Sequence, residues 1–127
     1  HQVIEHYSNS LEVEPEKVAL NPMDEELLKK AIAVVEKHMD DVEFSTDDFA
    51  REMYMSRSNL HIKMKALTGE STNEFIRKIR FSRACKLLKE GRYSVSEIST
   101  MVGFNTPSYF ATSFKKYFGC LPSEYGK

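Results

Sequence analysis

The chain has 127 residues with 18 Lys and Arg against 19 Asp and Glu, a formal net charge of −1. This length allows one compact domain or two small subdomains that share a helix, and no apolar run is long enough to span a membrane. Two cysteines, Cys85 and Cys120, lack the spacing of a metal site, so we interpret them as small apolar fillers of a cytoplasmic protein and expect no metal or cofactor.

The charge is unevenly distributed along the chain. Residues 1–55 hold 14 acidic and 5 basic side chains, whereas residues 56–127 hold 5 acidic and 13 basic ones. An asymmetry of this kind indicates that the second part binds a polyanion.

The first 21 residues are acidic and lack a sustained periodicity, which predicts a linker from an upstream domain. Asn21 and Pro22 then provide a cap and a first-turn proline for an amphipathic helix. Its expected inner face carries Leu28, Ile32, Val35 and Met39.

Two shorter helices are predicted next. Ser45 and Asp48 form a capping arrangement that opens a helix ending near Met53. A further helix is expected from Ser56 to about Thr68, where Gly69 stops it.

The longest predicted helix begins at the capping box of residues 71–74 and ends at Gly91, a length of roughly 29 Å. Its inward residues are expected to be Phe75, Ile76, Ile79, Ala84, Leu87 and Leu88. Residues 94–97 form another capping box, Thr106 and Pro107 open a further helix, and Pro122 introduces a short last one.

Residues 50–75 and 99–125 repeat one pattern, a short helix, a tight turn and a second helix, which is typical of a helix-turn-helix unit. Each copy has a small residue, Ala50 or Ser99, where the two helices must cross closely. Up to the turn, the aligned positions are 49 residues apart and pair Phe49, Ala50, Met53 and Met55 with Ile98, Ser99, Val102 and Phe104. After the turn, they are 50 residues apart and pair Leu60, Met64, Leu67, Gly69, Glu74 and Phe75 with Phe110, Phe114, Tyr117, Gly119, Glu124 and Tyr125. The second copy therefore has one extra residue in the connection between its helices.

The sequence thus predicts an all-α protein of about seven helices. We expect an acidic linker over residues 1–21 and one domain over 22–127. Within that domain, a first helix-turn-helix subdomain covers 22–70, a connector helix 71–91 and a second subdomain 92–127.

The stretch GFNTPSYFATSFKKYFGCLPSEY, residues 103–125, resembles the signature of the AraC/XylS family of transcription regulators, and FAREMYMSRSNLHIKMKALTG (49–69) and FIRKIRFSRACKLL (75–88) extend the match. The resemblance implies two helix-turn-helix units, joined by a long helix, that bind one DNA site and regulate transcription. The lead-in over residues 12–41 resembles the joint before this module in hybrid two-component regulators.

Three positions depart from the family pattern. Tyr54 stands where the family usually has glycine in the first turn, so that turn is expected to differ in shape. Ser99 replaces the usual alanine, and Gly126 replaces the arginine that closes the family's Pro-x-x-Tyr-Arg motif.

The candidate DNA-binding side chains lie opposite the inward faces of the two recognition helices. Ser58 and His61 suit base edges, Ile62 suits a thymine methyl group, and basic residues suit phosphates. The candidates are Arg57, Ser58, His61, Ile62 and Lys65 in the first copy and Asn105, Thr106, Ser108, Thr112 and Lys115 in the second. Connector residues Arg77, Lys78, Arg80 and Arg83 are further phosphate candidates, although Arg80 and Arg83 suit intramolecular salt bridges equally well.

Other function classes fit less well. Four scattered histidines and the lack of a glycine-rich phosphate loop give no enzyme site. A protein-interaction module that has lost DNA binding remains the alternative, and effector binding is disfavoured. The expected partners are double-stranded DNA, RNA polymerase or a second copy of the chain, and an upstream receiver domain. We expect a cytoplasmic segment without membrane contact. A membrane anchor and a histidine kinase are both compatible with its full-length parent.

Overall fold

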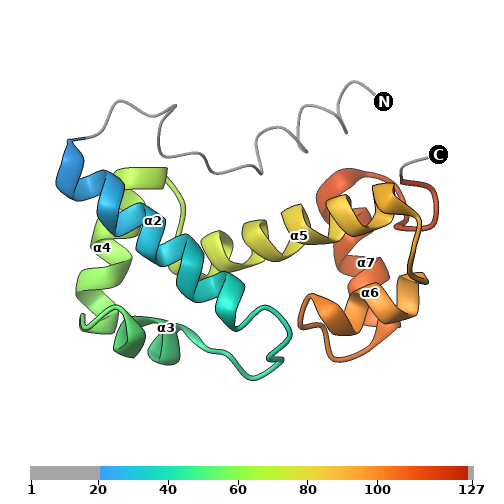
Figure 1. The fold of residues 1–127 in the computed structure, drawn as a ribbon, viewed down its shortest axis with the longest axis horizontal. Coiled ribbons are helices and arrows are strands. Elements are labelled where there is room, and N and C mark those ends of the chain that lie inside the picture. The colour runs from blue at the N-terminus through green and yellow to red at the C-terminus, as the bar shows by residue number, and fades with distance from the viewer. Residues whose placement is uncertain (1–20, 126–127) are drawn as a thin grey trace. The chain divides into compact units, whose positions relative to one another are not determined.

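The computed structural model describes residues 21–125, and every regular element in this part of the chain is a helix (Figure 1). The helices are α2 (Pro22–Lys37), α3 (Thr46–Glu52), α4 (Arg57–Thr68), α5 (Thr72–Glu90), α6 (Val95–Met101) and α7 (Pro107–Phe118). The predicted all-α fold is confirmed. The acidic linker predicted over residues 1–21 lies outside the described residues, except for Asn21.

The short last helix expected after Pro122 is instead a single hydrogen-bonded turn. The Tyr125 N–H lies 3.2 Å from the carbonyl oxygens of both Leu121 and Pro122. The turn goes no further within the described residues, and the Tyr125 side chain packs into the core.

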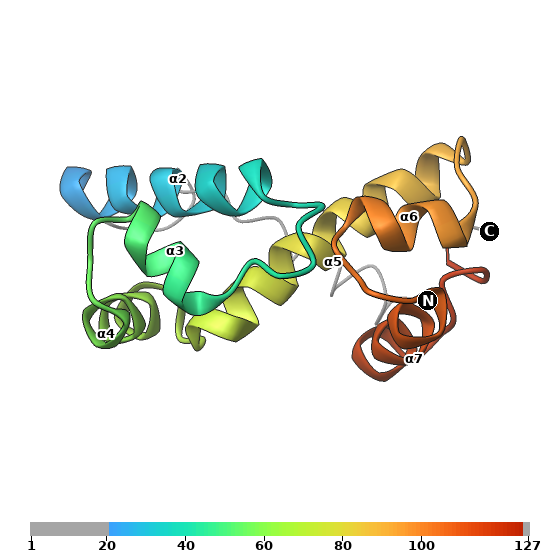
Figure 2. The ribbon, with the colours of Figure 1, turned by 90° about the horizontal axis from the view of Figure 1, so that it is seen from below.

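The described residues form two compact units. One comprises residues 21–38 and 43–79, and the other comprises Met39–Val42 with residues 80–125. Helix α5 contributes to both, since the division falls between Ile79 and Arg80. Within the units α3 packs against α4 and α6 packs against α7, as Figure 2 shows.

The helices begin and end at the residues that the capping signals indicate. The Asn21 side chain accepts a hydrogen bond from the Asp24 N–H at 2.8 Å. Complete capping boxes open α3, with Ser45 and Asp48, and α6, with Ser94 and Glu97. Gly69 and Gly119 end α4 and α7 in the left-handed conformation, at φ 77° and 84°.

The core of the unit containing α2–α4 combines aliphatic residues of α2 with the inner faces of α3, α4 and the start of α5. Ile32, predicted to face inward, is only half-buried, because the inner stripe of α2 passes through Ala31 and Val34 instead. The fully enclosed side chains are Leu28, Ala31, Val35, Phe49, Leu60, Met64 and Phe75.

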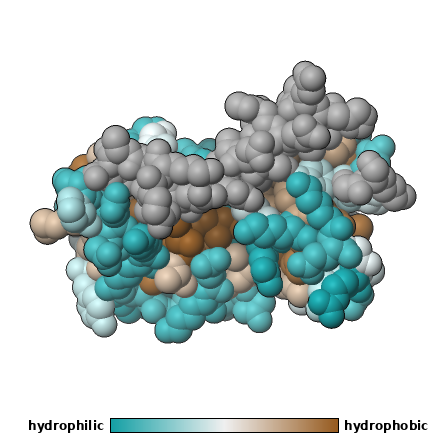
Figure 3. Space-filling model, turned by 45° about the horizontal axis from the view of Figure 1, so that its top comes forward, coloured by the Kyte–Doolittle hydropathy of each residue, from teal (hydrophilic) through white to brown (hydrophobic). Residues whose placement is uncertain are grey.

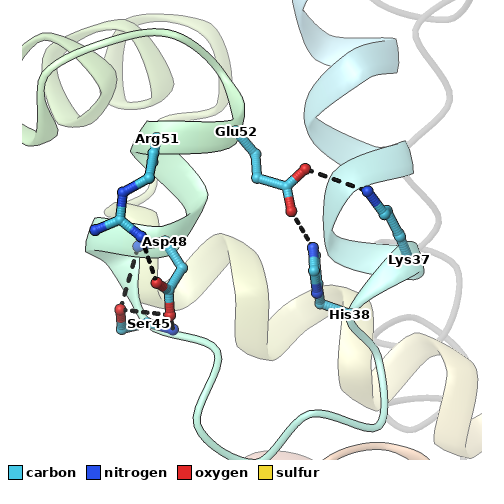
Figure 4. A network of polar contacts seen from close by, with 6 residues as sticks. All are labelled: Lys37, His38, Ser45, Asp48, Arg51 and Glu52. Atoms are coloured by element: carbon cyan, nitrogen blue, oxygen red, sulfur yellow. Dashed lines mark hydrogen bonds and ion pairs between the residues drawn. The ribbon is translucent and has the colours of Figure 1, made fainter.

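A polar network ties the end of α2 to α3, as Figure 4 shows. Glu52 pairs with His38 and with Lys37, the Lys37 Nζ lying 3.5 Å from the carboxylate. The hydrogen bond with His38 is the main reason why the pKa of Glu52 lies below its ordinary value. The His38 ring also stacks on Phe44, with ring centroids 4.6 Å apart.

The core of the other unit is aromatic and is centred on Phe81. Its ring centroid lies 5.6 Å from those of Phe104 and Phe118 and 5.9 Å from that of Phe114. Phe81 was absent from the predicted inward residues of the connector, whereas Cys85, interpreted from the sequence as a small apolar filler, is buried.

The turns of the two helix-turn-helix copies share one hydrogen-bond pattern. Met55 N–H donates to Ala50 O at 3.0 Å, and the matching Phe104 N–H donates to Ser99 O at 2.9 Å. The residue directly before the donor has a left-handed backbone in both copies. Its φ is 57° at Tyr54 and 81° at Gly103. The expectation of a different first turn is therefore wrong, since Tyr54 adopts the backbone conformation that a glycine would take.

The extra residue of the second copy is located by the helix caps. Ser56 caps α4 directly after Met55, whereas Asn105 stands between Phe104 and the cap of α7, Thr106. The insertion therefore leaves the turn itself unchanged and lengthens only the approach to the second recognition helix.

Candidate nucleic-acid interface

Helix α4 separates a buried face from a polar one, as the pattern of the first copy predicts. Leu60 and Met64 are fully buried, and Leu67 is half-buried. All five candidate residues on this helix are exposed: Arg57, Ser58, His61, Ile62 and Lys65. Ile62 is 65% exposed, and from this position an apolar side chain can contact a thymine methyl group.

Helix α7 has the same division. Phe110, Phe114 and Phe118 are buried, while Tyr117, predicted to be inward, is half-buried. The candidates Asn105, Thr106, Ser108, Thr112 and Lys115 are exposed. The Thr106 hydroxyl accepts the Tyr109 N–H at 3.1 Å as the helix cap, and its own proton remains available to an acceptor.

Two basic side chains of α4 have acidic partners from other helices. Arg57 Nη1 lies 3.5 Å from Asp47, and Lys63 Nζ lies 3.4 Å from Asp24. The Arg57 and Asp47 side chains are 67% and 61% exposed, and exposed pairs of this kind contribute less than about 1 kcal/mol. Arg57 can therefore exchange its carboxylate for a phosphate at little cost.

The four basic connector residues divide into two groups. Lys78 forms an ion pair with Glu70 at 2.8 Å, and Arg80 donates to the carbonyl oxygens of Asp41 at 2.8 Å and Gly103 at 3.2 Å. Arg80 thus binds backbone carbonyls rather than the carboxylate expected of a salt bridge. Arg77 and Arg83 are exposed and remain phosphate candidates.

Sequence reasoning missed Tyr109, which is 57% exposed in the first turn of α7. It follows Ser108 and lies three residues before Thr112, so it borders the predicted reading face. The sequence pattern assigned Tyr109 no position. Because Phe110 faces inward, its neighbour, rotated by about 100° around the helix, lies at the edge of the buried face.

A groove beside α4 brings candidate residues together with others that were not predicted. Its cavity volume is about 540 Å³. The lining residues are Thr46, Arg57, Ser58, His61, Ile62, Ser71, Thr72 and Asn73. Four of them are predicted candidates, and the last three come from the start of α5.

Two negative findings concern residues 21–125. This part of the chain contains no group of three or more His, Cys, Asp or Glu side chains placed to hold a metal ion. None of its helices is both long and apolar enough to cross a membrane. Figure 3 shows hydrophilic residues over much of the described surface on one face.

Comparison with known proteins places these features in a family. Residues 49–127 match the family model described as "Helix-turn-helix domain". The chain is 40% identical over 119 residues to Histidine kinase P4 of Formosa agariphila, covering 94% of this chain but only 9% of that protein.

Two solved structures have the same fold. The C-terminal domain of AraT, a response regulator from Geobacillus stearothermophilus, superposes with a TM-score of 0.73 at 29% identity, covering 85% of this chain and 86% of that one. The DNA-binding domain of AdpA, a global transcriptional factor solved in complex with a target DNA, gives a TM-score of 0.70 at 27% identity, covering 78% and 88%.

Proposed function

Since the chain belongs to the AraC-type helix-turn-helix family, we propose that it binds duplex DNA through α4 and α7 as the output domain of a transcription regulator. One observation carries the proposal. The matching positions Ser58 and Ser108, and likewise Lys65 and Lys115, are exposed in both copies, although the opposite faces of the same helices are fully buried.

The exposed faces have the chemistry that DNA requires. Hydroxyl and imidazole groups can bond to base edges, Ile62 can contact a thymine methyl group, and lysines can contact phosphates. Because these side chains are small and include little arginine, we expect backbone contacts and DNA shape to supply much of the specificity.

We further propose that a receiver domain precedes this chain in a full-length cytoplasmic signalling protein. We also propose that RNA polymerase or a second copy of the chain contacts this chain on DNA. Two relatives support this context, a histidine kinase of which the chain spans 9% and the C-terminal domain of a response regulator. In that arrangement this chain carries no catalysis, and any kinase activity belongs to other domains.

The salt dependence of DNA binding tests the proposal. The affinity of the 127-residue chain for a mixed-sequence duplex should fall steeply as the salt concentration rises. A plot of log affinity against log salt concentration should have a slope of about −0.9 for each phosphate contacted. Lys65→Ala and Lys115→Ala should each reduce the slope by about that amount. Lys37→Ala, on α2 and outside both reading helices, is the matched control and should leave the slope unchanged.

The alternative function makes the opposite forecast. A helical module that has lost DNA binding would show a slope near zero for the wild-type chain. That result would rule out the DNA-binding proposal and favour a protein partner.

A further inference from the structure

The groove beside α4 is chemically suited to an anion. Its lining consists of four hydroxyl groups, the Asn73 amide, the His61 imidazole, the Arg57 guanidinium and one apolar side chain, Ile62. No carboxylate lines it, although this unit is rich in acidic residues. Apart from Ile62, every lining side chain can donate a hydrogen bond.

One hydroxyl group in the groove lacks a partner. Thr72 is 4% exposed, and its Oγ1 forms no hydrogen bond in the described part of the chain. A buried polar group without a partner is unfavourable, and native structures usually supply one. Thr72 lines the groove, so a rotation of its enclosed side chain about χ1 would let the hydroxyl donate to a ligand oxygen held there.

Two helix N-termini add backbone donors. Arg57 and Ser58 open α4, and Thr72 and Asn73 open α5. The hydroxyls of Ser56 and Ser71 accept the third amide of each helix, from Asn59 and Glu74. The backbone amides of the first two residues of each helix have no acceptor within their own helix. The helix dipole favours a negative charge beside these amides.

The second copy lacks this set of donors at the matching positions. At the established offsets Val95 replaces Thr46 and Pro107 replaces Arg57, while Leu121 and Pro122 replace Ser71 and Thr72. Proline has neither a hydroxyl nor an amide N–H, so the second copy cannot provide the same contacts. The hydrogen bonds of the two turns and the caps of α4 and α7 nevertheless agree between the copies.

We propose that this groove is a binding site for one phosphate of the DNA backbone, held by Thr72, Asn73 and Arg57, and that the first helix-turn-helix copy alone has it. The inference rests on the proposed function. A phosphate here lies next to the α4 face carrying Ser58 and His61. It therefore fixes the register of α4 in the major groove without reading sequence.

Thr72→Val tests the site, because it removes the hydroxyl and keeps the shape. The hydroxyl has no partner in the free chain, so the melting temperature should not fall. Affinity for a duplex selected from a random pool by the wild-type chain should drop on the order of tenfold, as for a lost hydrogen bond to a charged group. The salt slope should stay the same, since no charge is removed.

Two further variants complete the design. Arg57→Ala should lower the salt slope by about 0.9, because it removes one ionic contact. Ser123→Ala changes the residue that matches Asn73 in the second copy and should bind like the wild type. Ethylation of the contacted phosphate should weaken binding of the wild type more than that of Thr72→Val, which keeps the Arg57 contact but has already lost the hydroxyl contact.

The outcomes separate this inference from the proposed function. If Thr72→Val binds as tightly as the wild type and no ethylated phosphate distinguishes the two, the site is wrong while DNA binding stands. If the wild-type chain shows no salt-dependent binding, both are wrong. A loss of affinity with Ser123→Ala equal to that of Thr72→Val would show that the site is not confined to the first copy.

Discussion

Tyr54 carries a backbone conformation that its residue type resists. It is left-handed at φ 57°, while its side chain is 88% exposed and lies under the Lys30 ammonium at 4.6 Å. A left-handed residue with a Cβ atom costs about 1–2 kcal/mol. An exposed cation–π contact returns only about 0.5–1 kcal/mol of this.

A pair of substitutions isolates the backbone term. Tyr54→Ala and Tyr54→Gly both remove the ring, but only glycine relieves the left-handed strain. We expect Tyr54→Gly to be more stable than Tyr54→Ala by about 1 kcal/mol, as measured by urea unfolding. Equal stability of the two variants would show that the turn relaxes without cost.

Gly103, the matching residue of the second copy, should tolerate a side chain far less well. It has φ 81°, and an added Cβ would lie 2.6 Å from the Met39 carbonyl oxygen and 2.9 Å from Arg80 Cζ. Gly103→Ala should therefore cost more than about 2 kcal/mol, the backbone strain plus a steric clash. Gly119→Ala, at φ 84° with open space around it, is the control and should cost less in the same unfolding experiment.

Individual residues show where sequence reasoning reaches its limit. The alignment of Tyr54 with a glycine position exposed a conflict in the turn, but only coordinates show that the backbone keeps its shape. Thr72 was visible merely as the second residue of a capping box. Its proposed role in phosphate binding depends on a groove between α4 and the start of α5. The spacing of apolar residues along a helix does not predict such a groove.

At the scale of the elements, the capping boxes make stability depend on pH. Hydrogen bonds from Ser94 hold the pKa of Glu97 below its ordinary value of 4.5, and Ser45 does the same for Asp48. A carboxyl group whose pKa is lowered by folding stabilises the fold above its unfolded pKa, and this contribution is lost as the pH falls through the folded value.

Glu97→Gln provides the test. The wild-type chain should lose stability as the pH falls below about 4.5, and the glutamine variant should lose less over the same range because this group no longer titrates. Thermal unfolding from neutral pH to pH 3 measures the difference. Parallel curves for the two proteins would contradict the assigned role of the Glu97 carboxylate.

The close helix crossings predict a second effect at this scale. Ala50 is 3% exposed and Ser99 is fully buried, its hydroxyl bonding only within its own helix to Ser96 O at 2.7 Å. Ala50→Leu and Ser99→Leu should each destabilise by about 1–3 kcal/mol through overpacking. Ser99→Ala is the matched control. It loses only the hydrogen bond to Ser96 O and should destabilise less than Ser99→Leu in chemical denaturation.

Elements were the best-predicted level because their ends are encoded locally. Caps such as Ser45 and Ser94 and terminators such as Gly69 act within one helical turn, so a short stretch of sequence contains the whole signal. The segment after Pro122 shows the limit of such signals. A proline allows a helix to start, but within the described residues only a single turn forms there.

At the scale of the whole molecule, the division of charge along the sequence does not separate an acidic unit from a basic one. Asp24 and Asp47 come from the acidic part of the sequence, yet they pair with Lys63 and Arg57 on α4. The first reading helix is thereby partly neutralised by its own unit. If Arg57 contacts a phosphate, DNA must displace the Asp47 carboxylate, so Asp47→Asn should raise affinity in the salt titration. Unchanged or weaker binding would show that the Arg57 pair does not compete with phosphate.

The two reading helices should contribute separable parts of one extended DNA site. Helix α5 has 19 residues, which corresponds to roughly 28 Å, against about 34 Å between successive major-groove openings on one side of DNA. If α5 sets the spacing, the DNA must bend to accept both helices, so flexible steps between the half-sites should improve binding. Changing Ser58 and His61 to alanine should alter base preference in one half-site, and changing Ser108 and Thr112 should alter it one turn away.

Selection from a random pool followed by footprinting measures both effects. Each double variant should relax specificity in its own half-site and leave the preference in the other half unchanged. A protected region shorter than one helical turn, or a change at the same base pairs in both variants, would mean that only one helix reads DNA. The second helix would then serve as a structural partner, and its exposed hydroxyl face would be open to RNA polymerase or a second copy of the chain.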